Sequence, residues 1–221
     1  NLAIIEAEND INTRCIILTG SGEKAFAAGA DIKEFISFRK KEGEELSRKG
    51  QKSLFDLLDN LKTPSIALIN GFALGGGLEL AMSCHIRIAL ENAKMGLPEV
   101  TLGLIPGYGG TQRLANLVGK GKAMEMISTA GMLTAIEAKE WGLVNSVCPN
   151  KDLILAAEKI ASKIKKNSPM AVAKAIKSIN AGFVNNLDGF EVEKEEFGNC
   201  FGTPEFIEGT TAFMEKRKPN F

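Results

Sequence analysis

The stretch that decides the fold is SIALINGFALGGGLE, residues 65–79. It begins with an uninterrupted apolar run that ends at Asn70, which is typical of a strand buried on both faces of a sheet. The glycines from Gly71 onward predict a turn, and residues 77–83 are predicted to be helical. A second apolar run at residues 85–89 predicts the next strand. This strand, helix, strand order indicates parallel strands with helices packed against the sheet.

The same pattern continues on both sides of this stretch. Residues 14–20 are a β-branched and apolar run that ends at a glycine, so we expect a buried strand there. A loop rich in glycine and alanine is expected at residues 24–31, and residues 32–61 have a charged, helical pattern. Residues 96–110 are dense in glycine and proline, and most of the chain after them is predicted to be helical.

Capping residues mark three helix starts in the second half of the chain. They are the capping box Thr134-x-x-Glu137 and the pairs Ser168-Pro169 and Thr203-Pro204. We therefore predict two parts: an α/β core with the active site, residues 1–145, and a C-terminal helical region, residues 146–221.

The composition excludes several classes of function. Lys plus Arg and Asp plus Glu each number 27, so the net charge is zero and no basic surface is expected to hold a nucleic acid. Four scattered cysteines and a single histidine, His85, provide no metal-ligand spacing and no Ser-His-Asp triad. We therefore expect no metal, and we interpret His85 as a structural residue in a strand.

The apolar window at residues 66–84 resembles a membrane span in composition only. It contains Asn70, three consecutive glycines and Glu79, which favour a buried active segment. The chain begins at Asn1 and enters directly on an apolar run, so we expect that an upstream piece is missing. No basic-then-apolar leader supports export.

Three segments have small residues and a few charges where packing would favour larger side chains. They are KAFAAGAD at residues 24–31, NGFALGGGLE at residues 70–79, and GLPE with IPGYGGT at residues 96–99 and 105–111. Two of the segments leave buried strands as loops. Such loops gather at the carboxyl ends of parallel strands, where ligands bind.

The triple glycine and two acids point to chemistry at these loops. Glycines before a helix expose N–H groups at the positive end of its dipole, which suits a developing oxyanion, although a tight turn is the alternative interpretation. Glu79 follows Gly76 by about one helical turn, and an acid in an apolar segment is costly to bury without a partner or a task. Glu99 is a second acid, and two carboxylates facing one pocket would separate in pKa into a base and an acid. A surface position on a turn is the alternative for Glu99.

The three segments, in this order, closely resemble the signature stretches of the crotonase superfamily, in particular short-chain enoyl-CoA hydratases. The resemblance runs from about Asn9 to Phe221 and includes residues 107–113, 138–145 and 213–218. It implies an α/β crotonase fold, a ClpP-like spiral of β-β-α units with a C-terminal helical trimerisation region. It also implies a homo-oligomer, either a trimer or a dimer of trimers.

The resemblance further implies the roles of individual residues. The N–H groups of Ala30 and Gly76 would hold the thioester oxygen, and Gly107 would support the acids through its backbone. Glu79 would act as the base toward water, and Glu99 would exchange the proton at the α-carbon. The positions that match coenzyme A contacts are Lys24, Ala28, Ile32, Lys33, Phe213 and Lys216, of which Lys216 would reach a neighbouring subunit's ligand. Each lysine could equally be a solvated charge.

The implied activity is that of a hydro-lyase that adds water reversibly, in the syn sense, to trans-2-enoyl-CoA and gives 3-hydroxyacyl-CoA in fatty acid β-oxidation or related acyl-CoA metabolism. Coenzyme A is part of the substrate, and we expect no separate cofactor, no nucleic acid partner and no membrane partner. The expected location is the bacterial cytoplasm or the mitochondrial matrix.

Three alternatives remain: an enoyl-CoA isomerase of the same superfamily, an RNA-binding hydratase relative, and a catalytically silent scaffold. The presence of both Glu79 and Glu99 favours hydration, because isomerisation needs only one base. Zero net charge disfavours RNA binding.

Two features depart from the family pattern. Relatives usually begin with a strand and an Asn-Arg-Pro-type segment that helps to bind coenzyme A, and this chain starts after it. His85 stands where relatives usually have aspartate. Because His85 lies away from the acid pair, we expect an altered local hydrogen bond and unaltered chemistry.

Overall fold

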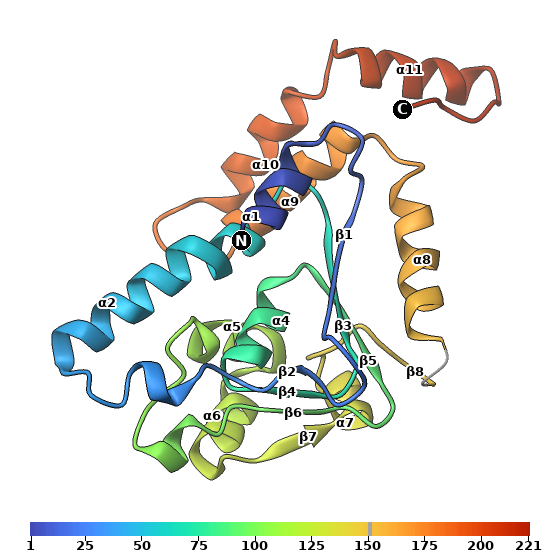
Figure 1. Cartoon of the computed structure of the whole chain (residues 1–221). Coiled ribbons are helices and arrows are strands. Elements are labelled where there is room, and N and C mark those ends of the chain that lie inside the picture. The colour runs from blue at the N-terminus through green and yellow to red at the C-terminus, as the bar shows by residue number, and fades with distance from the viewer. Residues whose placement is uncertain (150–151) are drawn as a thin grey trace. The chain divides into compact units, whose positions relative to one another are not determined.

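The strands alternate between two sheets. The computed structural model describes residues 1–149 and 152–221, and the strands in these residues form two four-stranded sheets. One sheet has the order β1-β3-β5-β8 and the other the order β2-β4-β6-β7 (Figure 1). The strands are β1 (Ile16–Thr19), β2 (Ala25–Ala27), β3 (Ser65–Ile69), β4 (Phe72–Leu74), β5 (Ile86–Leu90), β6 (Lys94–Gly96), β7 (Met132–Thr134) and β8 (Ser146–Cys148).

Strands follow one another along the chain in twos, and the two strands of each set belong to different sheets. These sets are β1 and β2, β3 and β4, and β5 and β6, and helical segments separate one set from the next. Pairing within the sheets is parallel for β3 with β5, β5 with β8, β2 with β4 and β4 with β6. Only the pairing of β6 with β7 is antiparallel among the described ladders. The path of the chain is therefore a spiral of β-β-α units.

Strand β3 forms the core of the first sheet. Its residues Ile66 to Ile69 are at most 1 % exposed, which explains why the sequence lacks polar alternation there. At the end of β3, the Asn70 side chain donates to the carbonyl oxygens of Gly20 and Gly22 at 3.1 and 2.7 Å, and it accepts from the Gly20 N–H. Asn70 thereby links the end of β3 to the turn that follows β1.

Helical segments connect the strands along the chain and make up most of it after β8. The helical segments are α1 (Leu2–Asn9), η1 (Ile32–Glu34), α2 (Lys40–Gly50), the π-helical η2 (Gln51–Phe55), α3 (Asp56–Asp59), α4 (Gly76–Ser83), η3 (Glu99–Leu102), α5 (Gly110–Val118), α6 (Lys120–Thr129), α7 (Ala135–Glu140), α8 (Leu153–Ile164), α9 (Pro169–Ala181), α10 (Gly189–Gly198) and α11 (Pro204–Met214). Among the described residues, every helix is too short or too polar to span a bilayer.

Helix α4 is the element that the triple glycine introduces. Its N-cap is Gly75, whose φ of 52° lies in the region that favours glycine. The helix contacts strands β2, β3 and β4 as well as helix α5. Residues at its first turn are therefore held between the sheets and the following helices.

The described residues group into two compact units. One unit comprises Asn1, Ile17–Asp59 and Ser65–Ala157, and it contains both sheets except the first residue of β1. The other comprises Leu2–Ile16, Asn60–Pro64 and Glu158–Phe221, and within it Glu196 of α10 binds Lys174 and Lys177 of α9. The sequence-based division at residue 145 stays a prediction.

The predictions for the longer elements are confirmed. The strands expected at residues 14–20, 65–70 and 85–89 correspond to β1, β3 and β5, and the helix expected at residues 77–83 corresponds to α4. The predicted caps at Thr134, Ser168 and Thr203 each accept a hydrogen bond from the backbone N–H three residues later. The chain after α8 is helical, as expected.

Two local predictions were wrong. Strands β2 and β4 lie within the segments predicted to be a loop and a turn, because three-residue strands are too short for an alternating pattern. Residues 32–61 do not form one helical stretch, since residues 35–39 separate η1 from α2 and α3 ends at Asp59.

His85 makes structural contacts, as predicted, but it lies directly before β5 and not within the strand. Its Nδ1 accepts from the Ser65 N–H at 3.1 Å. Its Nε2 lies 3.3 Å from the carbonyl oxygen of Asp59, so both ring nitrogens contact backbone groups.

Candidate active site

The first acid, Glu79, lies in the first turn of α4 and is only 1 % exposed. Its Oε1 accepts hydrogen bonds from the backbone N–H groups of Tyr108 and Gly110, at 2.7 and 2.8 Å. Burial raises the pKa of the Glu79 carboxyl above its ordinary value, while the two N–H groups and the Arg113 charge act in the opposite direction. The site therefore holds an acid that is both buried and bound by backbone donors.

The second acid, Glu99, begins η3 immediately after the loop that leaves β6. A Cβ built on Gly75 would lie 2.9 Å from the Glu99 Oε1, so this carboxylate lies directly against the N-cap of α4. Its Oε2 is buried and has no hydrogen-bond partner among the described residues. Burial raises the pKa of Glu99, and the nearby Glu79 charge raises it further.

Both acids line one cavity of about 1290 Å³ within the first unit. Its walls include the loop after β2, most of α2, the start of α4, and the segment from Pro98 to Gln112. Ligand pockets commonly measure about 300–1,000 Å³, so this space suits a large or elongated ligand. The segments that the sequence analysis singled out thus surround a common space.

Two backbone amides face the same region. A Cβ built on Gly76 would lie 3.8 Å from the Ala30 nitrogen, and both residues line the cavity. Within residues 1–149 and 152–221, no hydrogen bond occupies either N–H group. The Gly76 N–H also lies at the start of α4, where the helix dipole is positive. This arrangement can stabilise negative charge on an oxygen atom.

Gly107 was expected to support the acids through its backbone, and the contacts in the structure differ from this in detail. The N–H groups that bind Glu79 belong to Tyr108 and Gly110, whereas the Gly107 carbonyl oxygen accepts hydrogen bonds from Ser47 and Gln51. Gly107 still lines the cavity.

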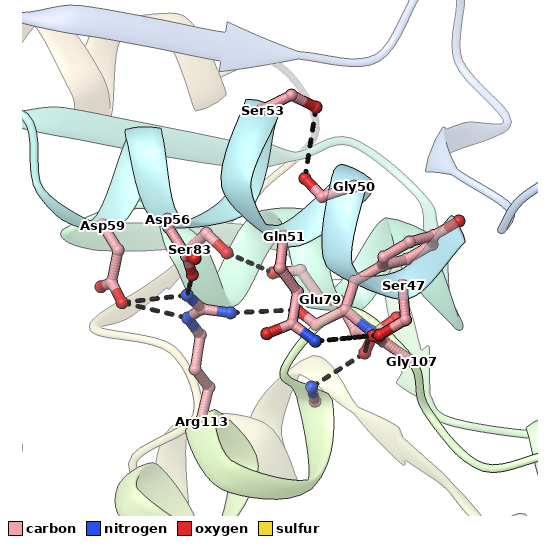
Figure 2. A network of polar contacts seen from close by, with 12 residues as sticks. Ser47, Gly50, Gln51, Ser53, Asp56, Asp59, Glu79, Ser83, Gly107 and Arg113 are labelled. Atoms are coloured by element: carbon pink, nitrogen blue, oxygen red, sulfur yellow. Dashed lines mark hydrogen bonds and ion pairs between the residues drawn. The ribbon is translucent and has the colours of Figure 1, made fainter. Parts of the chain in front are cut away.

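Arg113 also binds the loop between η3 and α5, which contains Gly107 and Tyr108, as Figure 2 shows. Its Nη1 donates to the Tyr108 carbonyl oxygen at 3.0 Å, and its remaining nitrogens bind Asp56 and Asp59 of α3 at 3.0 to 3.2 Å. The sequence did not indicate a role for Arg113, because nothing in the local pattern shows that α5 and α3 meet.

The residues predicted to contact coenzyme A fall into three groups. Ala28 and Ile32 line the cavity. Lys24 and Lys33 are exposed and lie outside its lining. Phe213 and Lys216 are exposed residues of the second unit, and their contact with a ligand stays a prediction.

Four basic residues that the sequence did not single out also line the cavity: Arg39, Lys40, Arg48 and Lys52. All belong to α2, its N-cap or the following η2, and their charged, helical pattern was visible without indicating which face would meet a ligand. Among the described residues, no group of three His, Cys, Asp or Glu side chains could hold a metal ion.

Comparison with known proteins identifies the family. The family model described as enoyl-CoA hydratase/isomerase matches residues 1–221. The chain belongs to this family. The short-chain-enoyl-CoA hydratase of Clostridium acetobutylicum is 49% identical over 214 residues, which cover 96% of this chain and 82% of that protein. The crotonyl-CoA hydratase of Syntrophomonas wolfei is 45% identical over 220 residues, covering 99% and 84%.

Solved structures of the family share the fold. The crystal structure of enoyl-CoA hydratase from Bacillus anthracis superposes with a TM-score of 0.91 and 43% identity, and the match covers 100% of this chain and 85% of that one. The crotonase fold predicted from the sequence is thereby confirmed. The predicted trimerisation stays a prediction.

The Tyr108 ring provides a test of how the site is packed. The ring stacks on Phe55 of η2, with centroids 4.7 Å apart, and a Cβ on Gly50 would overlap it. We expect Gly50→Ala to destabilise the protein by about 1–3 kcal/mol through overpacking, although alanine is the better helix former. Thermal unfolding measures the effect.

Two comparisons make this prediction specific. In a Tyr108→Ala background the same Gly50→Ala change should be neutral or stabilising, because the overlap is gone. Gly43→Ala, also in α2, adds a Cβ with nothing within 4 Å and should not destabilise. A loss of stability that persists without the ring would contradict the packing described here.

The partly buried carboxyl of Glu99 leads to a prediction about stability and pH. The pKa of Glu99 in the folded state lies above the ordinary value of 4.5, because burial favours the neutral carboxyl. This neutral form contributes fully to the stability of the fold below pH 4.5, and the contribution is lost as the pH rises through the folded-state pKa. We expect Glu99→Gln to raise the melting temperature at neutral pH by about 2–4 °C, which corresponds to about 1 kcal/mol. Below pH 4.5 the difference should disappear. Glu45→Gln, which changes an exposed acid of α2, is the control, and an equal gain there would refute the explanation.

Proposed function

We propose that this chain is an enoyl-CoA hydratase, a hydro-lyase that adds water reversibly to trans-2-enoyl-CoA and gives 3-hydroxyacyl-CoA. The observation that carries the proposal is the position of Glu79 and Glu99 on one cavity with the N–H groups of Ala30 and Gly76, which have no hydrogen-bond partner in the described part of the chain. Membership of the enoyl-CoA hydratase/isomerase family supports it, as do the relatives named as hydratases.

In this mechanism the two N–H groups bind the oxygen of the substrate thioester. They withdraw electron density from the carbonyl, which makes the β-carbon electrophilic and stabilises the enolate that forms after water attacks. The amides of Ala30 and Gly76 are part of the folded backbone. They therefore need little reorganisation when the charge develops.

The acids move the protons. Glu79 takes a proton from the attacking water, and Glu99 delivers or receives the proton at the α-carbon. Both hydrogen bonds to Glu79 from the loop reach Oε1, and within the described residues none reaches Oε2, so Oε2 is the oxygen that would accept from water. The Glu79 charge raises the pKa of Glu99, so an ionised Glu79 favours the protonated form of the second acid.

The cavity also has properties suited to a coenzyme A thioester. Its volume fits an elongated ligand, and the basic side chains that line it from α2 and η2 provide charge for phosphate groups. Ala28 and Ile32 would contact the adenine and pantetheine path, and Lys24 and Lys33 would lie near the phosphates. Lys216 and Phe213 would contact the ligand of a neighbouring subunit.

We further propose the biological setting implied by the family. The chain would assemble as a trimer or a dimer of trimers and would act in fatty acid β-oxidation or related acyl-CoA metabolism, in a bacterial cytoplasm or a mitochondrial matrix. An isomerase of the same family is the second candidate, and the pair of acids argues against it because isomerisation needs only one base.

Substitution of the acids tests the proposed chemistry. We expect Glu79→Gln and Glu99→Gln each to lower the rate of crotonyl-CoA hydration by at least about 100-fold, because each removes one proton-transfer group. The loss of crotonyl-CoA absorbance measures the rate. If either variant keeps nearly the wild-type rate, the assignment of that acid is wrong; if the wild-type chain instead only shifts the double bond of a 3-enoyl-CoA, it is an isomerase.

Two substitutions of Gly76 distinguish the effect of losing its N–H donor from the effect of adding a side chain. Gly76→Pro removes the N–H at the first helical position, where proline is well tolerated, and should cost about 3 kcal/mol in the barrier, or about 100-fold in kcat. Gly76→Ala keeps the N–H, and its Cβ would make ordinary contacts of 3.5 Å or more. The alanine variant should therefore keep most of the activity. Equal loss in both variants would mean that space, and not the N–H donor, matters at this position.

A further inference from the structure

The peptide unit between Gly107 and Tyr108 is bonded at both of its ends. Its N–H donates to the Glu79 Oε1 at 2.7 Å. Its carbonyl oxygen, which belongs to Gly107, accepts from the Ser47 hydroxyl at 2.5 Å and from the Gln51 side-chain amide at 2.9 Å (Figure 2). One rigid amide plane thus connects two side chains of the α2 and η2 segment to an acid of α4.

Ser47 and Gln51 are arranged as a pair. They are four residues apart, so their side chains lie on the same face of the helical segment. Gln51 also donates to the Ser47 hydroxyl oxygen at 3.1 Å. Gln51 is the first residue of the π-helical η2, and such segments occur frequently at functional sites.

We propose that Ser47 and Gln51 are positioning residues for hydration, which hold the Gly107–Tyr108 peptide in the orientation that binds Glu79. This inference rests on the proposed function, in which Glu79 is the base. Neither side chain has to touch the reacting atoms. Their effect passes through one peptide unit.

Two physical effects support this role. The donors at the carbonyl oxygen prevent the planar amide from rotating, so the N–H at its other end stays directed at Glu79. They also polarise the amide, and a polarised amide is a stronger N–H donor to a carboxylate, since hydrogen bonds in chains reinforce one another. Without Ser47 and Gln51, both the direction and the strength of the bond to Glu79 should decline.

The pH dependence of catalysis separates this role from a merely structural one. The Tyr108 N–H favours the ionised form of Glu79, so weakening it should raise the pKa of that base and move the acid limb of the pH profile to higher pH. The charged or titratable groups that act on Glu79 are Arg113 of α5, Glu99 of η3 and the Tyr108 phenol. Substitutions of Ser47 and Gln51 leave all three in place.

The experiment compares Ser47→Ala, Gln51→Met and the double variant with the wild-type chain. We expect kcat for crotonyl-CoA hydration to fall about 10-fold in each single variant and by clearly more than about 100-fold in the double variant, with a much smaller change in KM. The double variant should lose more than the product of the single losses, because either donor alone still holds the oxygen. The acid limb should move to higher pH in each variant.

Ser53→Ala is the matched control. It removes a hydroxyl from η2 whose hydrogen bond, 3.5 Å long, reaches only the Gly50 carbonyl oxygen, and it should keep the wild-type kcat and pH profile. Thermal unfolding of every variant shows whether it is folded. If Gln51→Met does not fold, Ser47→Ala, a smaller change, tests the same claim by itself.

The outcomes are distinct. A wild-type chain that does not hydrate crotonyl-CoA contradicts the proposed function. An active wild type with folded variants that keep kcat overturns only the role of Ser47 and Gln51. A lower kcat with an unchanged acid limb overturns it as well, because that result indicates a contribution to folding without an effect on the base.

Discussion

The burial of the Glu79 carboxylate is the constraint on which the first unit depends. Removing a charge from water costs free energy unless other donors replace the water. Here the donors are the N–H groups of Tyr108 and Gly110, which both reach Oε1. The loop that carries them must therefore stay close to the start of α4. Arg113 on one side, and Ser47 with Gln51 on the other, bind the carbonyl oxygens of that loop and keep it there.

The second acid lowers the stability of the fold, and the proposed chemistry explains why such an acid is present. Glu99 has a buried oxygen without a partner among the described residues, and its pKa is raised by burial and by Glu79. A buried polar atom without a hydrogen bond destabilises a fold. A carboxyl with a raised pKa, however, keeps its proton to higher pH and can donate it, so the same feature that weakens the fold would serve the proposed reaction.

The family assignment and the local geometry of the site give different kinds of information. Similarity over the whole chain assigns the family and the fold. The local geometry supplies what similarity alone does not: two amides without hydrogen-bond partners among the described residues, two acids on one cavity, and a peptide unit that connects α2 to Glu79, the proposed base. All of these groups belong to the first unit, so the proposed chemistry can be described within that unit.

The sequence by itself determined the elements whose signals are local. The apolar run of β3, the glycine start of α4 and the caps at Thr134, Ser168 and Thr203 depend on neighbours along the chain, and all were predicted correctly. Family resemblance supplied the spiral fold and the expected acids. Only the tertiary structure decided which groups hold Glu79 in place, because Ser47 lies far before Glu79 in the sequence and Tyr108 and Arg113 lie far after it. Hydrogen bonds between such segments depend on how helices and sheets pack, and no local pattern encodes that packing.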